Sequence, residues 1–357
     1  ISSFFAFTGM VAGLSNNEND YTLFYHNTKQ GRVRHDKVHN LFGYNMTRAA
    51  GEAFERLAPD KRILLYSRSA CIGMHRYGGI WTGDNQSWWS HILLALHMMP
   101  SLNMCGFLYE GPDIGGFGSN TTEDLLLRWY GLGIFSPLLR NHSASGTRRQ
   151  EPYRFKNKTA FAGILQLRYL LLPYLYSEYM KAALHDGMYC MPLAFSFPKD
   201  AFARQVEDEV MIGESLLIAP VYEQNARGRY VYLPEEMLQV RVNCAEGNRI
   251  ETSVLPAGHH YIPVALTEVV FFVREGHILP LAKDGRDIQT VADVDFADLR
   301  LFAYAPDGAA YTYYTDDGET KDYDNPAHFV HITLDAKGTA QSDRAAVKVE
   351  TAPAPLG

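Results

Sequence analysis

One short stretch, GIWTGDNQSWWS (residues 79–90), places a single carboxylate between aromatic rings. The Gly, Asn and Ser residues around Asp84 favour a loop, and loops often carry catalytic groups. A carboxylic acid beside aromatic rings is disfavoured in its charged form, which suits a general acid, and an indole ring also offers a face to a sugar. The alternative interpretation is that Asp84 caps or braces a turn between tryptophans, with Trp88 and Trp89 at the start of a helix and at least one of the two in the core.

Further polar and aromatic residues lie at the ends of predicted strands or in the loops that follow them. They are Arg68, Trp81, Asp84, Asp113, Phe117, Arg140 and His142. Active sites of parallel α/β barrels are built at strand ends, so these residues predict one site. Taken singly, Arg68 also fits an ordinary ion pair, and His142 fits a satisfied polar residue under a loop.

Other kinds of chemistry leave no pattern in the sequence. None of the 13 histidines forms an HxxxH or HExxH pair, and neither a Gly-rich phosphate loop nor a GxSxG turn occurs. The segment YTDDGETKDYD fails as a calcium loop, because Tyr313 and Thr315 stand where oxygen ligands are needed, so we interpret it as an Asp-Gly hairpin. A net charge of −7 without a basic stripe argues against nucleic acid as a partner.

The elements that must position these residues alternate in type along the first half of the chain. Helical periodicity predicts helices at residues 41–57, at 88–99 with a stop at Pro100, from Thr121 onward, and at about 161–185 with a kink at Pro173. Apolar runs at residues 62–69 and 105–113 predict buried strands between them. This alternation indicates a parallel sheet covered by helices.

The second half of the chain has a different pattern. Short β-type runs at residues 210–223, 228–236, 267–280 and 309–324 are separated by Gly, Pro and Asp-Gly. This pattern predicts an all-β, sandwich-like region that ends in a linker-like tail, TAPAPLG.

The cysteines and the apolar opening of the chain bear on its compartment. The four cysteines show no paired or metal-like spacing, so we expect free thiols and a reducing environment. The opening ISSFFAFTGMVAGL lacks a basic flank and is too short to span a bilayer. We therefore expect a cytoplasmic location and no membrane partner.

Several blocks, in order, resemble family 31 of the glycoside hydrolases, which includes α-glucosidases and α-xylosidases. The blocks are KVHNLFGYNMTRA, RSACIGMHRYGGIWTGDNQSWW, GFLYEGPDIGGFG and LLLRWYGLGIFSPLLRNHSASGTRRQEPY, between about residues 35 and 180. VYLPEE and FFVREGHILP resemble the β-domains that follow the barrel in that family. The resemblance implies an α/β plus all-β fold, with the C-terminal half of a (β/α)8 barrel at residues 1–188, a proximal β-sandwich at 189–281, and a distal β-sandwich and tail at 282–357.

The resemblance also assigns roles to the candidate residues. Asp84 in WTGDN matches the family's catalytic acid/base. The substrate-binding residues that it implies are Arg68, Trp81, Asp113, Phe117 and His142. No metal or cofactor is implied.

The family mechanism is retaining hydrolysis by two carboxylates about 5–5.5 Å apart. The family's nucleophile lies in a segment resembling WNDMNE, which residues 1–357 do not contain. We therefore expect a fragment of a longer exo-acting α-glucosidase that acts on α-linked gluco-oligosaccharides, and an isolated chain that is inactive. An α-xylosidase, lyase or transglucosidase of the same family, and a non-catalytic sugar-binding or scaffold descendant, remain alternatives. The sequence leaves the oligomeric state open.

Overall fold

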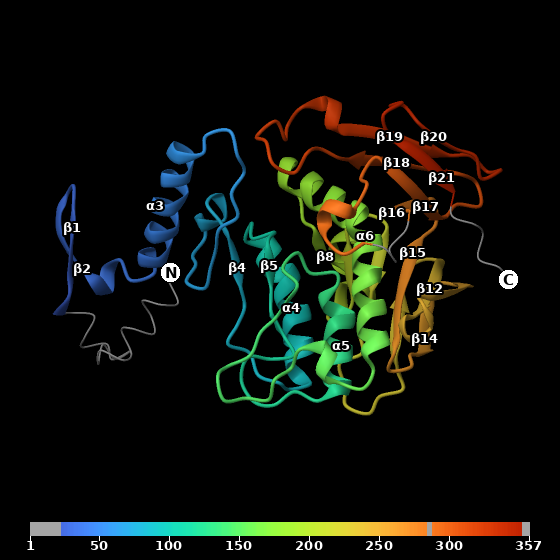
Figure 1. Cartoon of the computed structure of the whole chain (residues 1–357), viewed down its shortest axis with the longest axis horizontal. Helices are drawn as coiled ribbons and strands as arrows, with labels where there is room; N and C mark the ends of the chain where they lie inside the picture. Colours follow the sequence, from blue (N-terminus) through green and yellow to red (C-terminus); the bar gives the residue numbers. More distant parts are fainter. Residues whose placement is uncertain (1–22, 284–287, 352–357) are drawn as a thin grey trace.

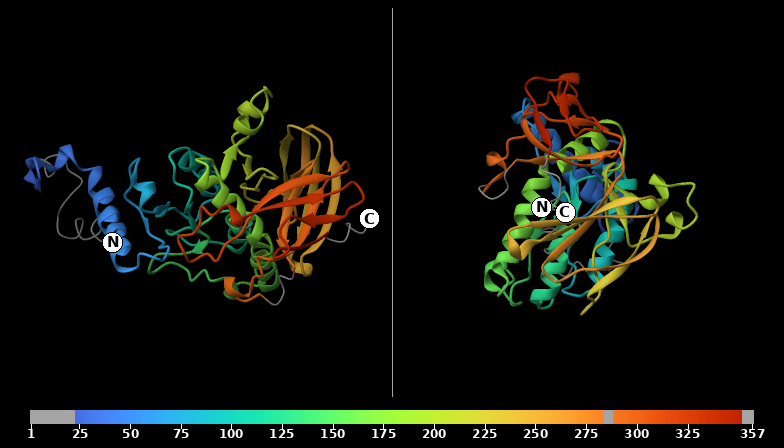
Figure 2. Two further views of the ribbon diagram at one scale, coloured as in Figure 1. Left: turned by 90° about the horizontal axis from the view of Figure 1, so that it is seen from above. Right: turned by 90° about the vertical axis from the view of Figure 1, so that its right-hand side faces the viewer.

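The computed structural model of the chain describes residues 23–283 and 288–351. The apolar opening at residues 1–14 and the tail after residue 351 lie outside this part. Figures 1 and 2 show an elongated molecule, with α3 at one end, α4 to α6 in the middle and the β-sheets of the second half at the other end. The order of these parts in space is therefore their order in the sequence. The helices are α3 (Leu41–Leu57), α4 (Ser90–Met104), α5 (Glu123–Gly133), α6 (Lys158–Leu184) and the single turn α7 (Leu193–Ser196).

The helix predictions are confirmed in type and position, with one correction. Helix α4 does not stop at Pro100 but continues to Met104. The last turn of α4 is held by tertiary contacts, because Asn103 Oδ1 accepts hydrogen bonds from the amides of Tyr189 and Cys190 at 3.0 and 2.8 Å. These contacts stabilise the turn that follows the proline, which has no amide hydrogen to donate. Helix α6 is continuous through Pro173, and the kink expected there stays a prediction.

The barrel part contains short parallel strands whose carboxyl ends meet at one edge. Strand β3 (Tyr66–Ser67) pairs with β4 (Gly79–Trp81), and β4 pairs with β5 (Glu110–Gly111). Strand β6 (Asp113–Ile114) pairs with β7 (Arg140–Asn141), also in parallel. A small antiparallel hairpin, β1 (Tyr25–Thr28) with β2 (Gly31–Arg34), precedes α3.

The prediction of a buried strand over residues 62–69 is wrong in extent and in burial. Only Tyr66 and Ser67 are in a strand, and Leu64 and Tyr66 are 60% and 43% exposed. Within the described residues β3 has a neighbour on one side only, which is β4. A strand with one partner leaves its far edge and part of its side chains in water.

The β-rich second half is confirmed. One antiparallel sheet has the order β13-β12-β15-β10-β9-β8, and a two-stranded sheet is formed by β11 and β14. Their bounds are β8 (Cys190–Pro192), β9 (Val210–Ile212), β10 (Leu216–Ile218), β11 (Gly228–Leu233), β12 (Met237–Asn243), β13 (Arg249–Leu255), β14 (Gly258–Pro263) and β15 (Glu268–Arg274).

Two further sheets follow, with the orders β16-β17-β21 and β18-β19-β20. Their strands are antiparallel except for β17 and β21, which pair in parallel. The bounds are β16 (His277–Ala282), β17 (Asp298–Tyr304), β18 (Ala309–Tyr314), β19 (Phe329–Leu334), β20 (Ala340–Ser342) and β21 (Lys348–Thr351). The predicted fold class, part of a barrel followed by β-sheet domains, is therefore confirmed, whereas the domain boundaries at 188 and 281 stay a prediction.

The Asp-Gly segment is not a tight hairpin. Strand β18 ends at Tyr314 and β19 begins at Phe329, so a long loop connects them. The loop is anchored by Asp316, whose side chain is 1% exposed and pairs with Arg62 of the barrel part. This pair between residues far apart in the sequence fixes the path of the loop. The Asp-Gly turn signal, which depends on neighbouring residues only, does not predict it.

Candidate active site

The parallel strands bring all of the candidate residues to one edge. Arg68 follows β3 directly, Trp81 is the last residue of β4, and Asp84 lies in the loop after it. Asp113 opens β6, and His142 follows β7. Because these strands run in parallel, their carboxyl ends place the residues on the same face of the barrel part.

Asp84 forms an ion pair with Arg68, which lies at the end of the neighbouring strand β3. Its Oδ2 lies 3.0 Å from Nη1 of Arg68, and the two side chains are 36% and 43% exposed. The guanidinium of Arg68 lies 5.8 Å from the ring centroid of Trp81. The aromatic enclosure of Asp84 that the sequence indicated is therefore absent, because the carboxylate is ion-paired and open to solvent.

Of the two other tryptophans of this stretch, Trp89 matches the structural alternative and Trp88 does not pack in the core. Trp88 is 54% exposed and packs edge-on against His91, and Trp89 packs against the main core at the start of α4. Trp81 is thus the aromatic partner of the site.

Asp113 and Arg140 form a second arginine–carboxylate pair, in which the carboxylate is buried. Asp113 is fully buried, and its Oδ1 accepts a hydrogen bond from Arg140, its register partner on β7. The guanidinium of Arg140 also lies 5.5 Å from the Trp81 ring centroid. Trp81 therefore contacts both arginines, and through them the two carboxylates belong to one cluster.

Several buried polar atoms of this cluster have no hydrogen-bond partner. They are Nε1 of Trp81, Oδ2 of Asp113 and Nε of Arg140. Buried donors and acceptors are nearly always paired in folded proteins, so each unpaired group needs an explanation. Of these atoms, Nε1 of Trp81 and Oδ2 of Asp113 lie together beside Gly83.

Gly83 shapes the space between these groups. A Cβ atom at this position would overlap Nε1 of Trp81 and Oδ2 of Asp113. Only glycine leaves room there, so the residue before Asp84 is constrained by the site itself. Gly83 also shows that the Trp81 and Asp113 side chains converge beside the Asp84 loop.

Phe117 and His142 form one wall of the cluster. Their rings are stacked, with centroids 5.3 Å apart and an interplanar angle of 28°. Phe117 lies in the loop after β6 and His142 in the loop after β7, so the contact joins two neighbouring strand ends. The structure therefore brings together all six predicted site residues, but their catalytic and binding roles stay a prediction.

Sequence reasoning missed two residues that hold the loops in place. Asn85 Nδ2 donates to the carbonyl oxygen of Asp113 at 3.0 Å, and the Asn85 carbonyl accepts from the amides of Phe117 and Gly118. Gln150 is 2% exposed, and its Nε2 donates to three carbonyl oxygens. These acceptors belong to Ile114, Gly116 and His142, at 3.1, 3.3 and 3.0 Å. A polar residue next to catalytic motifs was the only signal for them, and it is a weak one.

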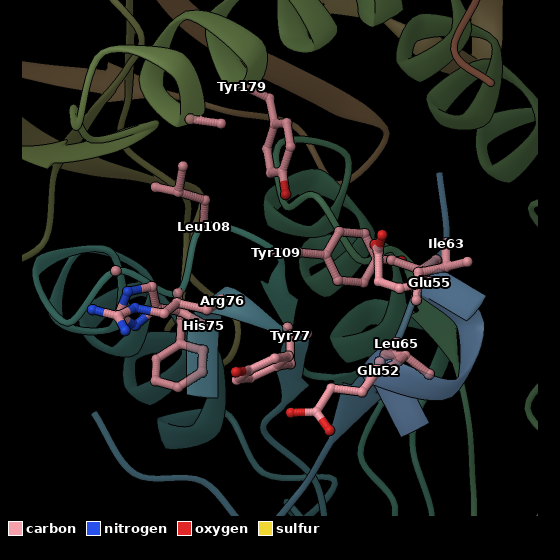
Figure 3. Close-up of a pocket in the computed structure, with 17 residues that line it drawn as sticks. Glu52, Glu55, Ile63, Leu65, His75, Arg76, Tyr77, Leu108, Tyr109 and Tyr179 are labelled. Atoms are coloured by element: carbon pink, nitrogen blue, oxygen red, sulfur yellow. The ribbon is translucent and has the colours of Figure 1, made fainter. Parts of the chain in front are cut away.

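A separate cavity of about 460 Å³ lies between α3, the strands and α6 (Figure 3). Glu52, Glu55, Tyr77, Tyr109 and Tyr179 line it, and none of the six predicted site residues does. It is therefore distinct from the candidate site. In the described part of the chain, no group of three or more His, Cys, Asp or Glu residues is arranged to hold a metal ion.

Glu110 is a buried acid close to the site that has no assigned role. It lies on β5, three residues before Asp113, and is 1% exposed with Oε1 unpaired. Burial raises the pKa of Glu110 to about 8. Its carboxyl group is therefore largely protonated at neutral pH.

Short parallel strands with arginine–carboxylate pairs and aromatic rings at their carboxyl ends have the layout of the active-site face of a (β/α)8 barrel. The family descriptions "Glycosyl hydrolases family 31 TIM-barrel domain" and "Glycosyl hydrolase family 31 C-terminal domain" match residues 8–178 and 187–279. The chain belongs to family 31 of the glycoside hydrolases.

Curated relatives of the chain are α-glucosidases. "Alpha-glucosidase 2" of Bacillus thermoamyloliquefaciens is 31% identical over 361 residues, which cover 93% of this chain and 44% of that protein. "Probable glucan 1,3-alpha-glucosidase" of Oryza sativa subsp. japonica is 33% identical over 84% of this chain and 32% of that protein. The chain thus spans less than half the length of these relatives.

Solved structures give the same assignment. The family 31 dextranase of Flavobacterium johnsoniae, complexed with glucose, is similar with a TM-score of 0.77 and 26% identity over 90% of this chain and 40% of that chain. The α3-Glc2-bound glucosidase II α subunit is similar with a TM-score of 0.75 and 26% identity over 90% of this chain and 38% of that chain.

The cysteines and helices add two further observations. All four cysteines, Cys71, Cys105, Cys190 and Cys244, are free thiols, as predicted. Within residues 23–283 and 288–351, every helix is too short or too polar to cross a membrane.

Proposed function

We propose that the chain is the acid/base-bearing part of a retaining, exo-acting α-glucosidase that removes terminal α-linked glucose from oligosaccharides. The observation that carries the proposal is the convergence of Trp81 and Asp113, each with an unpaired polar atom, beside the Asp84 loop. A glucose ring supplies several hydroxyl groups that can pair with them. Family membership and the glucose complex of the dextranase support the same ligand class.

In this proposal Asp84 protonates the glycosidic oxygen and later takes the proton from the attacking water. Arg68, 3.0 Å away, orients the carboxylate in the free protein. Asp113 and His142 bind sugar hydroxyls, and Phe117 and Trp81 flank the ring. The nucleophile is a second carboxylate contributed from outside this sequence, so the isolated chain is expected to be inactive.

The exposed location of Asp84 is compatible with an exo-acting site that receives a chain end. The free cysteines favour a reducing, cytoplasmic location for the protein. The preference for α-1,4, α-1,3 or α-1,6 linkages depends on groups around the leaving sugar.

The test compares the wild-type protein with Asp84→Asn, both in the longer protein that contains the nucleophile. Substrates are maltose, 4-nitrophenyl α-glucoside and 4-nitrophenyl α-xyloside. We expect cleavage of the glucoside over the xyloside, and a loss of about 10²- to 10⁴-fold for maltose in the variant. The rate of the first, bond-breaking step with the aryl glucoside should fall less, because nitrophenolate leaves without being protonated. Equal loss on maltose and on the aryl substrate would contradict the acid/base role.

A further inference from the structure

A groove of about 620 Å³ lies where the barrel part meets the first β-sheets. One wall is formed by α5 and the start of α4, and the other walls by loops and strands of the β11 to β15 region. Hydrogen bonds join α5 directly to the segment between β14 and β15. None of the six predicted site residues lines the groove, so it is separate from the candidate active site.

Arg128 of α5 holds the walls of the groove together. The residue is 7% exposed. Its Nη2 donates to the carbonyl oxygens of Val264 at 2.8 Å and Ala226 at 3.4 Å, and its Nη1 donates to that of Ala265 at 3.0 Å. One helix residue thereby fixes two loops of the β-region. The groove is therefore formed before any ligand binds, which lowers the entropic cost of binding.

The lining combines an aromatic ring with balanced charges. Trp89, which is partly buried against the main core, and the exposed Asn225 both line the groove. Three arginines and four carboxylates, a sum of −1, complete the polar lining: Arg128, Arg227, Arg241, Asp124, Glu223, Glu251 and Glu268. Arg241 and Glu268 pair at 2.6 Å, whereas Arg227 and Glu223 are exposed and have no ion pair within 4.0 Å in the described part of the chain.

These features fit a neutral ligand that is rich in hydroxyl groups. Carboxylates accept hydrogen bonds, guanidinium groups donate them, and an indole face packs against the apolar face of a sugar ring. The four carboxylates disfavour a phosphate or another anion. The three arginines among them disfavour a cation, so an uncharged sugar chain is the class that this lining accommodates best.

We propose that the groove is a second binding site for α-linked gluco-oligosaccharides, outside the catalytic pocket. Trp89 is the stacking platform, and Arg227 and Glu223 supply free polar groups at the rim. The choice of α-linked glucose units rests on the proposed function. The site would hold a longer glucan on the enzyme while its chain end is processed.

The four tryptophans offer a readout that separates the two sites. Trp81 belongs to the candidate active site, Trp89 lines the groove, Trp88 lies next to Trp89 outside the lining, and Trp129 is fully buried. Indole N–H signals of ¹⁵N-labelled protein, assigned by Trp→Phe variants, are followed while maltopentaose or isomaltopentaose is added. We expect the Trp89 signal to shift with saturation, and those of Trp88 and Trp129 to stay in place.

Variants show whether the Trp89 response belongs to the groove. Arg227→Ala should weaken the Trp89 midpoint about tenfold, the loss expected for a hydrogen bond to a charged group. The exposed Arg204→Ala, outside the groove, is the matched control and should leave the midpoint unchanged. In His142→Ala, a variant of the catalytic pocket, the Trp89 midpoint should also stay the same.

Two results would overturn the second site. The first is a Trp89 signal that does not move with either pentasaccharide. The second is a midpoint that His142→Ala weakens as much as it weakens that of Trp81, because the groove would then be an extension of the catalytic pocket. A moving Trp89 with a silent Trp81 would instead support the groove and count against the proposed function.

Discussion

At the scale of single residues, the candidate site contains two arginine–carboxylate pairs in different surroundings. Arg68 and Asp84 are 43% and 36% exposed, whereas Asp113 is fully buried beside Arg140. An exposed pair contributes little to stability, while a buried carboxylate that loses its partner is costly. The two arginines should therefore respond differently to the same substitution.

We expect Arg140→Met to lower the free energy of unfolding by about 3 kcal/mol or more, because Asp113 is left buried without a partner charge. Arg68→Met should change it by about 1 kcal/mol or less. Urea denaturation of the two variants beside the wild type measures the difference. A similar small change in both would show that Asp113 does not depend on Arg140.

Glu110 should make stability depend on pH. Its pKa is raised to about 8 in the folded protein by burial, against an ordinary value near 4.5 in the unfolded chain. The folded state therefore binds the additional proton between these values, and stability falls as pH rises from about 4.5 to about 8.

Glu110→Gln keeps the shape of the side chain and removes the titration. We expect the variant to gain stability relative to the wild type by up to about 1.4 kcal/mol per pH unit across this window. Urea denaturation at pH 5, 6, 7 and 8 measures the slope, with the exposed Glu246→Gln as control. Parallel pH profiles for the wild type and Glu110→Gln would refute the prediction.

At the scale of elements, the loop between β18 and β19 is bonded to the segment that leads into β3. Asp316, at the start of this loop, pairs with Arg62 and also accepts hydrogen bonds from the hydroxyls of Tyr176 and Tyr314, both at 2.6 Å. The amide of Arg62 donates to the carbonyl of Glu319 at 2.8 Å. The last β-region thus supports the strand after which Arg68 lies.

Asp316→Asn should lower the free energy of unfolding by about 3 kcal/mol, since its charge is shared by Arg62 and two tyrosines in a largely buried cluster. Lys321→Met breaks the neighbouring pair with Glu55, whose carboxylate is 62% exposed, and should cost about 1 kcal/mol or less. Thermal and urea unfolding of both variants test the contrast. Equal effects would mean that the loop is held by its backbone bonds and not by Asp316.

At the scale of the whole molecule, one apolar core runs from α4 and α5 through α6 into the β-sheets. Helix α6 joins the parts, because Tyr174 donates to the carbonyl of Ile212 at 2.6 Å and Ser177 accepts from the amide of Tyr314 at 2.9 Å. Exposed apolar side chains gather instead at the α3 end, among them Leu57 and Leu64.

This shared core predicts that residues 189–357 do not fold alone, since removing α6 uncovers the apolar faces that it packs against. The isolated segment should bind a hydrophobic dye and lack a cooperative thermal transition, whereas residues 90–351 together should unfold in one step. Calorimetry of the two chains gives the comparison. A sharp transition in the shorter chain would instead support an independent β-module.

The sequence by itself determined the types of most elements, the family and a list of candidate site residues. Helical periodicity over residues 41–57 and β-type runs after residue 210 are local signals, because each depends on side-chain spacing along the chain. The site residues were recognisable since each belongs to a motif at a strand end. Arg140 was in the sequence-predicted cluster but without a role, which its pair with Asp113 now supplies.

Only the tertiary structure decided how these groups meet. The path of α4 beyond Pro100, the exposure of Asp84 beside Arg68, the loop contacts of Asn85 and Gln150, and the anchor at Asp316 all depend on partners far away in the chain. The physical reason is that burial, ion pairing and unpaired polar groups are properties of the space between elements. The spacing of residues along the chain does not predict these properties, because they arise only when the strands and helices pack together.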